Sequence, residues 1–266
     1  MKIAVRRGHQ YTGQDGSSQG IVREIEVAER YYKLVIEGLK NLGHEVLDVT
    51  PPEANRTLSD SLNYGIEKTN NWGADLFVSC HVNNAYDSYN GTLGCEVIHH
   101  SNSSKGKDYA TKVEKQLANI GFKSREAKED TRGLAEINRT NCPCIIVEPF
   151  FVEATGDIAV YNSVGDNGIA NAIVKGITGQ DIPDNSNPTG NVYVVTEYLP
   201  TGYKGNGSTP GIDIGYVNDY MCGIWWELRS NSIGQWAVTE LLDPQTAIKV
   251  KESLGSWFCE FRTSNK

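Results

Sequence analysis

The sequence predicts an α/β domain with a twisted, mostly parallel sheet flanked by helices, followed by a small β-rich C-terminal domain. Two observations indicate the first domain: short apolar runs alternate with amphipathic stretches, and these stretches are long enough to be crossover helices. A third observation indicates the second domain, because the chain changes after residue 190 to short strand-like runs between Gly, Pro and Asn turns. We therefore divide the chain into residues 1–178, a linker at 179–190, and residues 191–266.

The first domain begins with a strand at 3–5. Apolar residues at helical spacing then predict a helix over 21–42, which Gly43 ends. The continuous apolar character of 75–81 is typical of a strand that is buried on both faces. The other expected elements are strands at 45–49, 93–99 and 144–147, and helices at 58–72, 107–120 and 164–177.

The segment 179–190 holds two prolines and two glycines and is polar, which is typical of a linker. The second domain contains four of the five tryptophans. Trp225 and Trp226 are adjacent on an expected strand, so one points inward and the other outward, and we expect the outward one to contact a ligand. Strands are expected at 191–198, 211–216, 222–228, 235–242 and 257–262, with a helix at 244–254.

Composition excludes several classes of function. The net charge is −8 and Lys and Arg form no cluster, which argues against nucleic-acid binding. No apolar run is long enough to insert into a membrane, and the N-terminus lacks the apolar core of a signal peptide. We therefore expect synthesis in a cytoplasm, with the six cysteines reduced and mostly buried. A substrate outside the membrane would be reached only after release.

Residues able to bind a metal follow the expected strands. His9 follows the first strand, His81 ends the strand at 75–80, and Glu148 ends the strand at 144–147. Glu24 lies in the first turn of the long helix and reaches His9 if the preceding glycine-rich loop folds back. Two imidazoles and a carboxylate with an open fourth position are a usual catalytic zinc site, and a further carboxylate, Glu148, is left as general base.

Four motifs carry a resemblance to a known family. They are Arg7-Gly8-His9, the segment 22–28 around Glu24, the segment 74–85 around His81, and the segment 143–151 around Glu148. In this order they resemble the zinc-dependent N-acetylmuramoyl-L-alanine amidases, and the resemblance covers roughly residues 1–178. It implies an amidase-like mixed sheet, zinc bound by His9, Glu24 and His81, and catalysis by Glu148.

The sequence departs from the family pattern beside the site. Arg6 stands where an acidic residue is common, Gln10-Tyr11 where two glycines are common, and Cys80 where isoleucine is common. These differences concern substrate preference and metal affinity more than the reaction. We name Tyr11, Asn83 and Arg139 as candidates for lining the substrate cleft.

The resemblance implies hydrolysis of the amide between N-acetylmuramic acid and L-alanine in peptidoglycan. A catalytic domain, a linker and a small aromatic module without a leader are similar to phage endolysins. The expected role is therefore lysis of a Gram-positive host after release from its cytoplasm, with residues 191–266 binding a wall polymer. This binding role rests on the domain arrangement alone.

Two other functions stay open. The chain could be another zinc peptidase of the wall, such as a carboxypeptidase, or a wall-binding protein that has lost catalysis. The residues also have ordinary explanations. His9 could cap a turn, Glu24 could complement a helix dipole, and His81 could be a core histidine. Glu148 could be a structural carboxylate, but only with an arginine partner such as Arg132 or Arg139.

Overall fold

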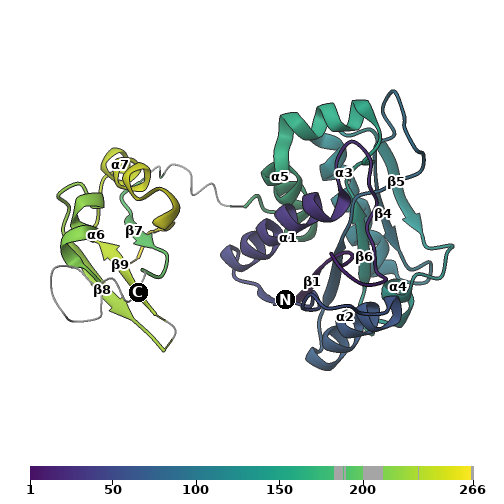
Figure 1. The fold of residues 1–266 in the computed structure, drawn as a ribbon, viewed down its shortest axis with the longest axis horizontal. Helices are drawn as coiled ribbons and strands as arrows, with labels where there is room; N and C mark the ends of the chain where they lie inside the picture. The colour runs from purple at the N-terminus through teal and green to yellow at the C-terminus, as the bar shows by residue number, and fades with distance from the viewer. Residues whose placement is uncertain (183–187, 189, 200–211, 233, 265–266) are drawn as a thin grey trace. The chain divides into compact units, whose positions relative to one another are not determined.

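Figure 1 shows the computed structural model, which describes residues 1–182, 188, 190–199, 212–232 and 234–264. The chain separates into two compact units, Met1–Pro183 and Asp184–Lys266. Of the linker predicted at 179–190, residues 183–187 and 189 lie outside the described residues.

The first unit is built on a six-stranded sheet with the order β2-β1-β3-β6-β4-β5. Every neighbouring pair is parallel except β4 with β6, which is antiparallel. The predicted mostly parallel sheet is thereby confirmed. The strands are β1 (Lys2–Arg7), β2 (Glu45–Asp48), β3 (Leu76–Cys80), β4 (Cys95–His99), β5 (Ser124–Glu129) and β6 (Cys144–Glu148).

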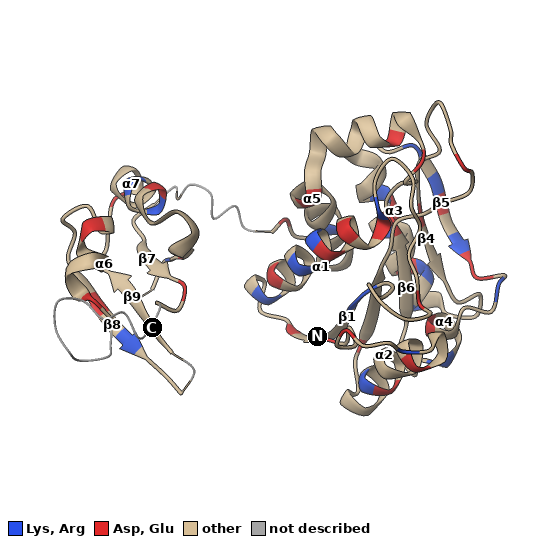
Figure 2. Ribbon diagram, in the orientation of Figure 1, with Lys and Arg blue, Asp and Glu red and all other residues tan. Residues whose placement is uncertain are grey.

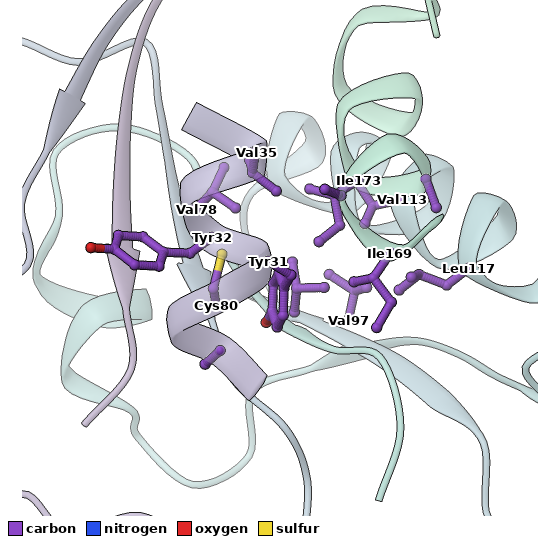
Figure 3. Close-up of a cluster of buried hydrophobic side chains, with 14 of the residues drawn as sticks. Tyr31, Tyr32, Val35, Val78, Cys80, Val97, Val113, Leu117, Ile169 and Ile173 are labelled. Carbon is purple, nitrogen blue, oxygen red and sulfur yellow. The ribbon is translucent and has the colours of Figure 1, made fainter. Parts of the chain in front are cut away.

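Three helices cover one face of this sheet: α1 (Glu24–Asn41), α3 (Ser104–Asn119) and α5 (Thr155–Thr178). Figure 3 shows their side chains meeting those of the strands in one buried cluster. The cluster includes Tyr31 and Val35 of α1, Val113 and Leu117 of α3, Ile169 and Ile173 of α5, and Val78 and Val97 of the sheet.

Two helices lie on the other face, α2 (Leu58–Trp72) and α4 (Ala135–Arg139). The bounds of α2 follow from its ends: the Thr57 side chain accepts a hydrogen bond from the Asp60 N–H, and Gly73 closes the helix at φ 69°. Ile137 of α4 packs with alternate residues of the sheet, among them Phe77 and Ile146.

Alternation along the strands places polar groups at the carboxyl ends of the sheet. In β6, Ile145 and Val147 belong to the core under α1, α3 and α5, whereas Ile146 faces α4. Glu148, two residues after Ile146, therefore faces the side of α2 and α4. Arg6 of β1 lies on the same side as Ala4 by the same rule. This side of the sheet end forms the site.

The second unit contains an antiparallel four-stranded sheet with the order β10-β7-β9-β8. Its apolar core joins the sheet to helices α6 and α7. The expectation of a small β-rich domain is thereby confirmed. Its elements are β7 (Tyr193–Thr196), α6 (Ile214–Tyr220), β8 (Trp226–Ser230), β9 (Gln235–Thr239), α7 (Pro244–Leu254), the 3-10 turn Gly255–Trp257 and β10 (Phe258–Arg262).

One predicted strand is wrong. Residues 211–216 were expected to be extended, but α6 begins at Ile214, and residue 211 lies outside the described residues. The Asp213 side chain accepts a hydrogen bond from the Tyr216 N–H and so caps this helix. The strand expected at 222–228 begins only at Trp226, because Cys222 and Gly223 turn the chain at positive φ.

Three features of the first unit were missed. The edge strand β5 and the short helix α4 were not predicted, and α5 begins at Thr155 rather than at 164. Helix α5 contains a kink at Gly165, which has φ 64° and ψ −175°, so the expected helix matches only the part after the kink.

Acidic and basic residues are interspersed, as Figure 2 shows along α1. No helix among the described residues is long and apolar enough to cross a membrane. All six cysteines are free thiols, and three of them, Cys80, Cys95 and Cys144, are buried. Cys142 and Cys259 are half-buried and Cys222 is exposed, so burial of the thiols is less complete than expected.

Candidate active site

His9, Glu24 and His81 converge at the carboxyl end of the sheet. One ligand atom from each of them lies within 4.8 Å of the other two. The Glu24 Oε1 is 3.1 Å from both His9 Nε2 and His81 Nδ1. Two imidazole nitrogens and a carboxylate oxygen aimed at one point suit a metal ion with an open fourth position. Glu24 was expected to reach His9 only if the glycine-rich loop before it folds back, and the loop does so.

The backbone before His9 is shaped for this convergence. A Cβ on Gly8 would lie 2.3 Å from the His81 ring, so only glycine lets the two histidines approach. His9 itself has φ 65°, a left-handed conformation that costs energy in a residue other than glycine. The two rings meet edge to face with centroids 4.8 Å apart.

Glu24 is fixed by backbone donors as well as by the histidines. Its Oε2 accepts a hydrogen bond of 2.9 Å from the Ser18 N–H, and its Oε1 accepts one of 3.1 Å from the Val82 N–H. Tyr31, about two helical turns after Glu24, donates its hydroxyl proton to the His81 carbonyl over 2.7 Å. The start of α1 and the end of β3 are thereby tied together.

A carboxylate that sequence reasoning missed orients His9. Asp15 Oδ1 lies 3.0 Å from His9 Nδ1, which must donate because a carboxylate only accepts. Asp15 Oδ2 accepts hydrogen bonds from Arg6 at 2.9 Å and from the Ser61 hydroxyl at 2.6 Å. Arg6 also pairs with buried Glu136. Carboxylates that hold metal-binding histidines in this way fix the ring and its tautomer.

One feature of the sequence signals this network. Arg6 directly follows the apolar run 3–5 of β1 and is fully buried, and a buried guanidinium requires carboxylate partners. Its partners, Asp15 and Glu136, come from a loop and from a helix that was not predicted, so the sequence alone does not identify them.

The electrostatics of the cluster favour a positive charge. Burial opposes protonation of His9, but hydrogen bonds to Asp15 and Glu24 and their negative charges raise its pKa to about 10. Burial likewise opposes ionisation of Asp15 and Glu24, yet the histidines, Ser61 and Arg6 hold the pKa of these carboxyls well below their usual range. A cleft that attracts a proton this strongly also attracts a cation.

Glu148 lies in the same cleft, but its pKa is shifted in the opposite direction from those of Asp15 and Glu24. It is buried, its Oε2 has no hydrogen-bond partner among the described residues, and no ion pair to Arg132 or Arg139 forms there. Burial, together with the negative charges of Glu24 and Glu96, raises the pKa of the Glu148 carboxyl well above its usual range. A carboxylate in such a setting is suited to accept and return a proton.

These groups line a cavity of about 360 Å³. Asn83 also lines it, and its side chain donates a hydrogen bond of 2.9 Å to Glu96. Arg132 lines it too, although sequence reasoning considered this residue only as a partner of Glu148. Two candidates lie elsewhere: Tyr11 is exposed and stacks with Arg7 and Arg23, and Arg139 is exposed at the end of α4.

Of the two adjacent tryptophans of the second unit, one points inward and the other outward, as expected. Trp226 packs against the core of that unit and donates its Nε1–H to Asn218 over 2.7 Å. Trp225 is the outward residue, with 62% of its surface exposed.

Comparison with known proteins identifies the family. The family model described as N-acetylmuramoyl-L-alanine amidase matches residues 3–179. The chain belongs to this family. Residues 3–179 are its enzymatic amidase domain, with a His-Glu-His group able to hold a metal ion.

Individual relatives agree with this assignment. The catalytic domain of the CD27L endolysin, which targets Clostridia difficile, is 30% identical and superposes with a TM-score of 0.62, covering 68% of this chain and 99% of that one. The catalytic domain of the CwlV amidase from Bacillus (Paenibacillus) polymyxa is 23% identical with a TM-score of 0.55, covering 67% and 97%, and shows the shared amidase fold.

An uncharacterised protein of Clostridium perfringens is 35% identical over 191 residues, which are 71% of this chain and 55% of that protein. A second C. perfringens protein, of 38.4 kDa, is 34% identical over 178 residues, which are 66% of this chain and 51% of that protein. The chain thus spans about half the length of the curated relatives it matches.

Proposed function

We propose that the protein is a zinc-dependent peptidoglycan hydrolase that cleaves the amide between N-acetylmuramic acid and L-alanine. The observation that carries this proposal is the placement of a His-Glu-His group beside a buried carboxylate, Glu148, in one cleft of an amidase domain. The donor set fits a zinc ion, and the missing side chain of Gly8 lets the His81 ring lie close to His9.

His9, Glu24 and His81 would hold the zinc, which would polarise the scissile carbonyl and acidify the attacking water. Glu148 takes the proton from this water and later returns it to the leaving amine of L-alanine. Asp15 keeps the Nδ1–H of His9 occupied, so that Nε2 points into the cleft. Apolar residues of the cleft, such as Leu134 and Ile146, limit the access of bulk water to Glu148.

The test is digestion of purified peptidoglycan by the zinc-loaded full chain, with and without a chelator. New amino-terminal alanine that disappears with the chelator and in Glu148→Gln is the expected result. Release of free D-alanine would indicate a carboxypeptidase instead. Binding to the wall without any cleavage would indicate a protein that has lost catalysis.

We further propose that residues 191–266 bind a polymer of the wall and that the protein acts as an endolysin against a Gram-positive host. Support comes from the separate second unit, from the exposed Trp225, and from the likeness of the first unit to an endolysin catalytic domain. In this role the protein is made in the host cytoplasm and reaches the wall after release.

Wall binding is measured with the full chain carrying Glu148→Gln, so that the wall stays intact. Trp225→Ala is expected to weaken binding to Gram-positive walls, whereas Leu241→Ala, which removes another exposed apolar side chain of the same unit, should not. Equal binding by both variants would contradict a role for Trp225. The endolysin role further requires lysis when the membrane of a producing cell is permeabilised.

A further inference from the structure

A second cavity adjoins the catalytic cleft in the first unit. Its volume is about 480 Å³, within the range of roughly 300–1,000 Å³ that is usual for ligand sites. Two chain segments form it, and both lead directly to metal-ligand positions. Residues 19–21 precede Glu24, and residues 87–90 follow His81, while Glu153 and Thr155 complete the lining.

The linings of the two cavities touch at two places. Ser18 lines the catalytic cleft and holds Glu24, and the next residue, Gln19, lines the second cavity. Asn84 lines the cleft and donates a hydrogen bond of 3.1 Å to Glu153 of the second cavity. The second cavity therefore lies next to the cleft, in contact with it through Ser18–Gln19 and Asn84–Glu153.

Three large apolar side chains are exposed at this cavity: Ile21 and Tyr89 line it, and Tyr86 stacks on Tyr89. Ile21 is 54% exposed, Tyr86 55% and Tyr89 36%. The rings of Tyr86 and Tyr89 stack with centroids 5.6 Å apart and an interplanar angle of 25°. Stacking covers the inner ring faces, and the exposure of both residues leaves outer aromatic surface open to solvent. The apolar face of a sugar ring packs against such a surface.

Hydrogen bonds hold the loop that carries the Tyr86–Tyr89 pair in place without any ligand. The buried carboxylate of Glu153 accepts hydrogen bonds from the Ala85 N–H at 2.9 Å and from the Tyr86 N–H at 3.0 Å. The Tyr89 N–H donates to the Glu153 carbonyl, and the Tyr89 carbonyl accepts from Thr155. Because the loop is already ordered, ligand binding costs little of its conformational entropy.

The charge of the cavity indicates the kind of ligand. The described residues that line it include Asp87 and Glu153 but no Lys or Arg, and its other polar groups are amides and hydroxyls. This lining disfavours the carboxylates of a wall peptide. It suits a neutral ligand that is rich in hydroxyl and acetamido groups.

We infer that the second cavity binds a neighbouring sugar of the glycan strand, next to the muramic acid whose amide is cut, with the Tyr86–Tyr89 pair as its platform. This inference rests on the proposed amidase function. It makes the enzyme selective for glycan strands longer than one disaccharide.

The experiment compares two substrates of the zinc-loaded full chain: soluble glycan strands that keep their stem peptides, and a muropeptide with a single disaccharide. The double variant Tyr86→Ala, Tyr89→Ala is expected to lose about ten-fold in kcat/KM on the strands, mainly through KM, and nothing on the muropeptide. The matched control, Tyr86→Phe with Tyr89→Phe, keeps the rings and should keep activity on both.

Equal loss on both substrates, or no loss on either, overturns the inference. An equal loss would place the stem peptide, not the glycan, in the cavity. A second measurement avoids dependence on that variant: peptide-free glycan strands should inhibit cleavage of the muropeptide by the unmodified protein, and absence of inhibition also overturns the inference. If the unmodified protein cleaves neither substrate, the proposed amidase function fails instead.

Discussion

Replacing Glu148 by glutamine should abolish cleavage and at the same time stabilise the metal-free protein. The carboxyl is buried, its Oε2 has no hydrogen-bond partner among the described residues, and its pKa is raised well above the ordinary value of 4.5. A group whose pKa is higher in the folded state stabilises the fold at low pH, and this contribution is lost as the pH rises above 4.5. Glutamine does not ionise, so the variant keeps its folding stability as the pH rises.

The magnitude follows from the cost of protonating the carboxyl. Each pH unit above 4.5 costs about 1.4 kcal/mol for as long as the folded carboxyl stays protonated. Glu148→Gln should therefore have nearly the stability of the unmodified protein at pH 4.5 and gain up to about 1.4 kcal/mol over it for each further pH unit. For a protein of this size, each kcal/mol shifts the melting temperature by about 2–4 °C.

The assay is calorimetric melting in the presence of a chelator between pH 4.5 and 7. Glu67→Gln, a change to an exposed carboxylate on α2, is the matched control and should shift the melting temperature little at any pH. A gain that does not grow with pH, or no gain at all, would refute the argument that burial keeps Glu148 protonated in the metal-free protein.

Three more outcomes follow from the site and from the thiols. Asp15→Asn should weaken zinc binding about 10–100-fold in competition with a chelator, whereas Asp108→Asn on the surface should not; equal affinities would contradict the orienting role of Asp15. Gly8→Ala should abolish zinc binding while circular dichroism stays native, because its Cβ overlaps the His81 ring; retained binding would show that the ring can move aside. Cys222 should be the first thiol of the native protein to react with a thiol reagent, and mass mapping of the labelled peptides would reveal any other order.

Much of the fold of the first unit was predictable because its elements carry local signals. The helix α2 has a capping threonine and a closing glycine, and its predicted bounds, 58–72, match the structure. The strand β5 carries no such signal. It lies at the edge of the sheet and contains Arg125, Lys128 and other charged residues, which protect an edge from pairing but hide the strand in the sequence.

The convergence of His9, Glu24 and His81 was expected from the ends of the strands and from the motifs, and the structure brings these side chains together. Of the three residues expected to line the cleft, Asn83 does so, whereas Tyr11 and Arg139 do not. What the sequence could not supply is which partners surround Arg6. That choice depends on how a loop and a short helix pack over the sheet, and no local pattern records it.

The metal-binding group can form only when β1 and β3 pair in the correct register. Arg7 pairs with Cys80, and the Gly8 N–H donates to the Cys80 carbonyl over 2.8 Å, so His9 and His81 follow directly from this alignment. Side chains alternate between the two faces, and a slip of one residue would turn His81 to the opposite side of the sheet. A misaligned chain would therefore lack the site altogether, and metal loading would separate correctly folded molecules from slipped ones.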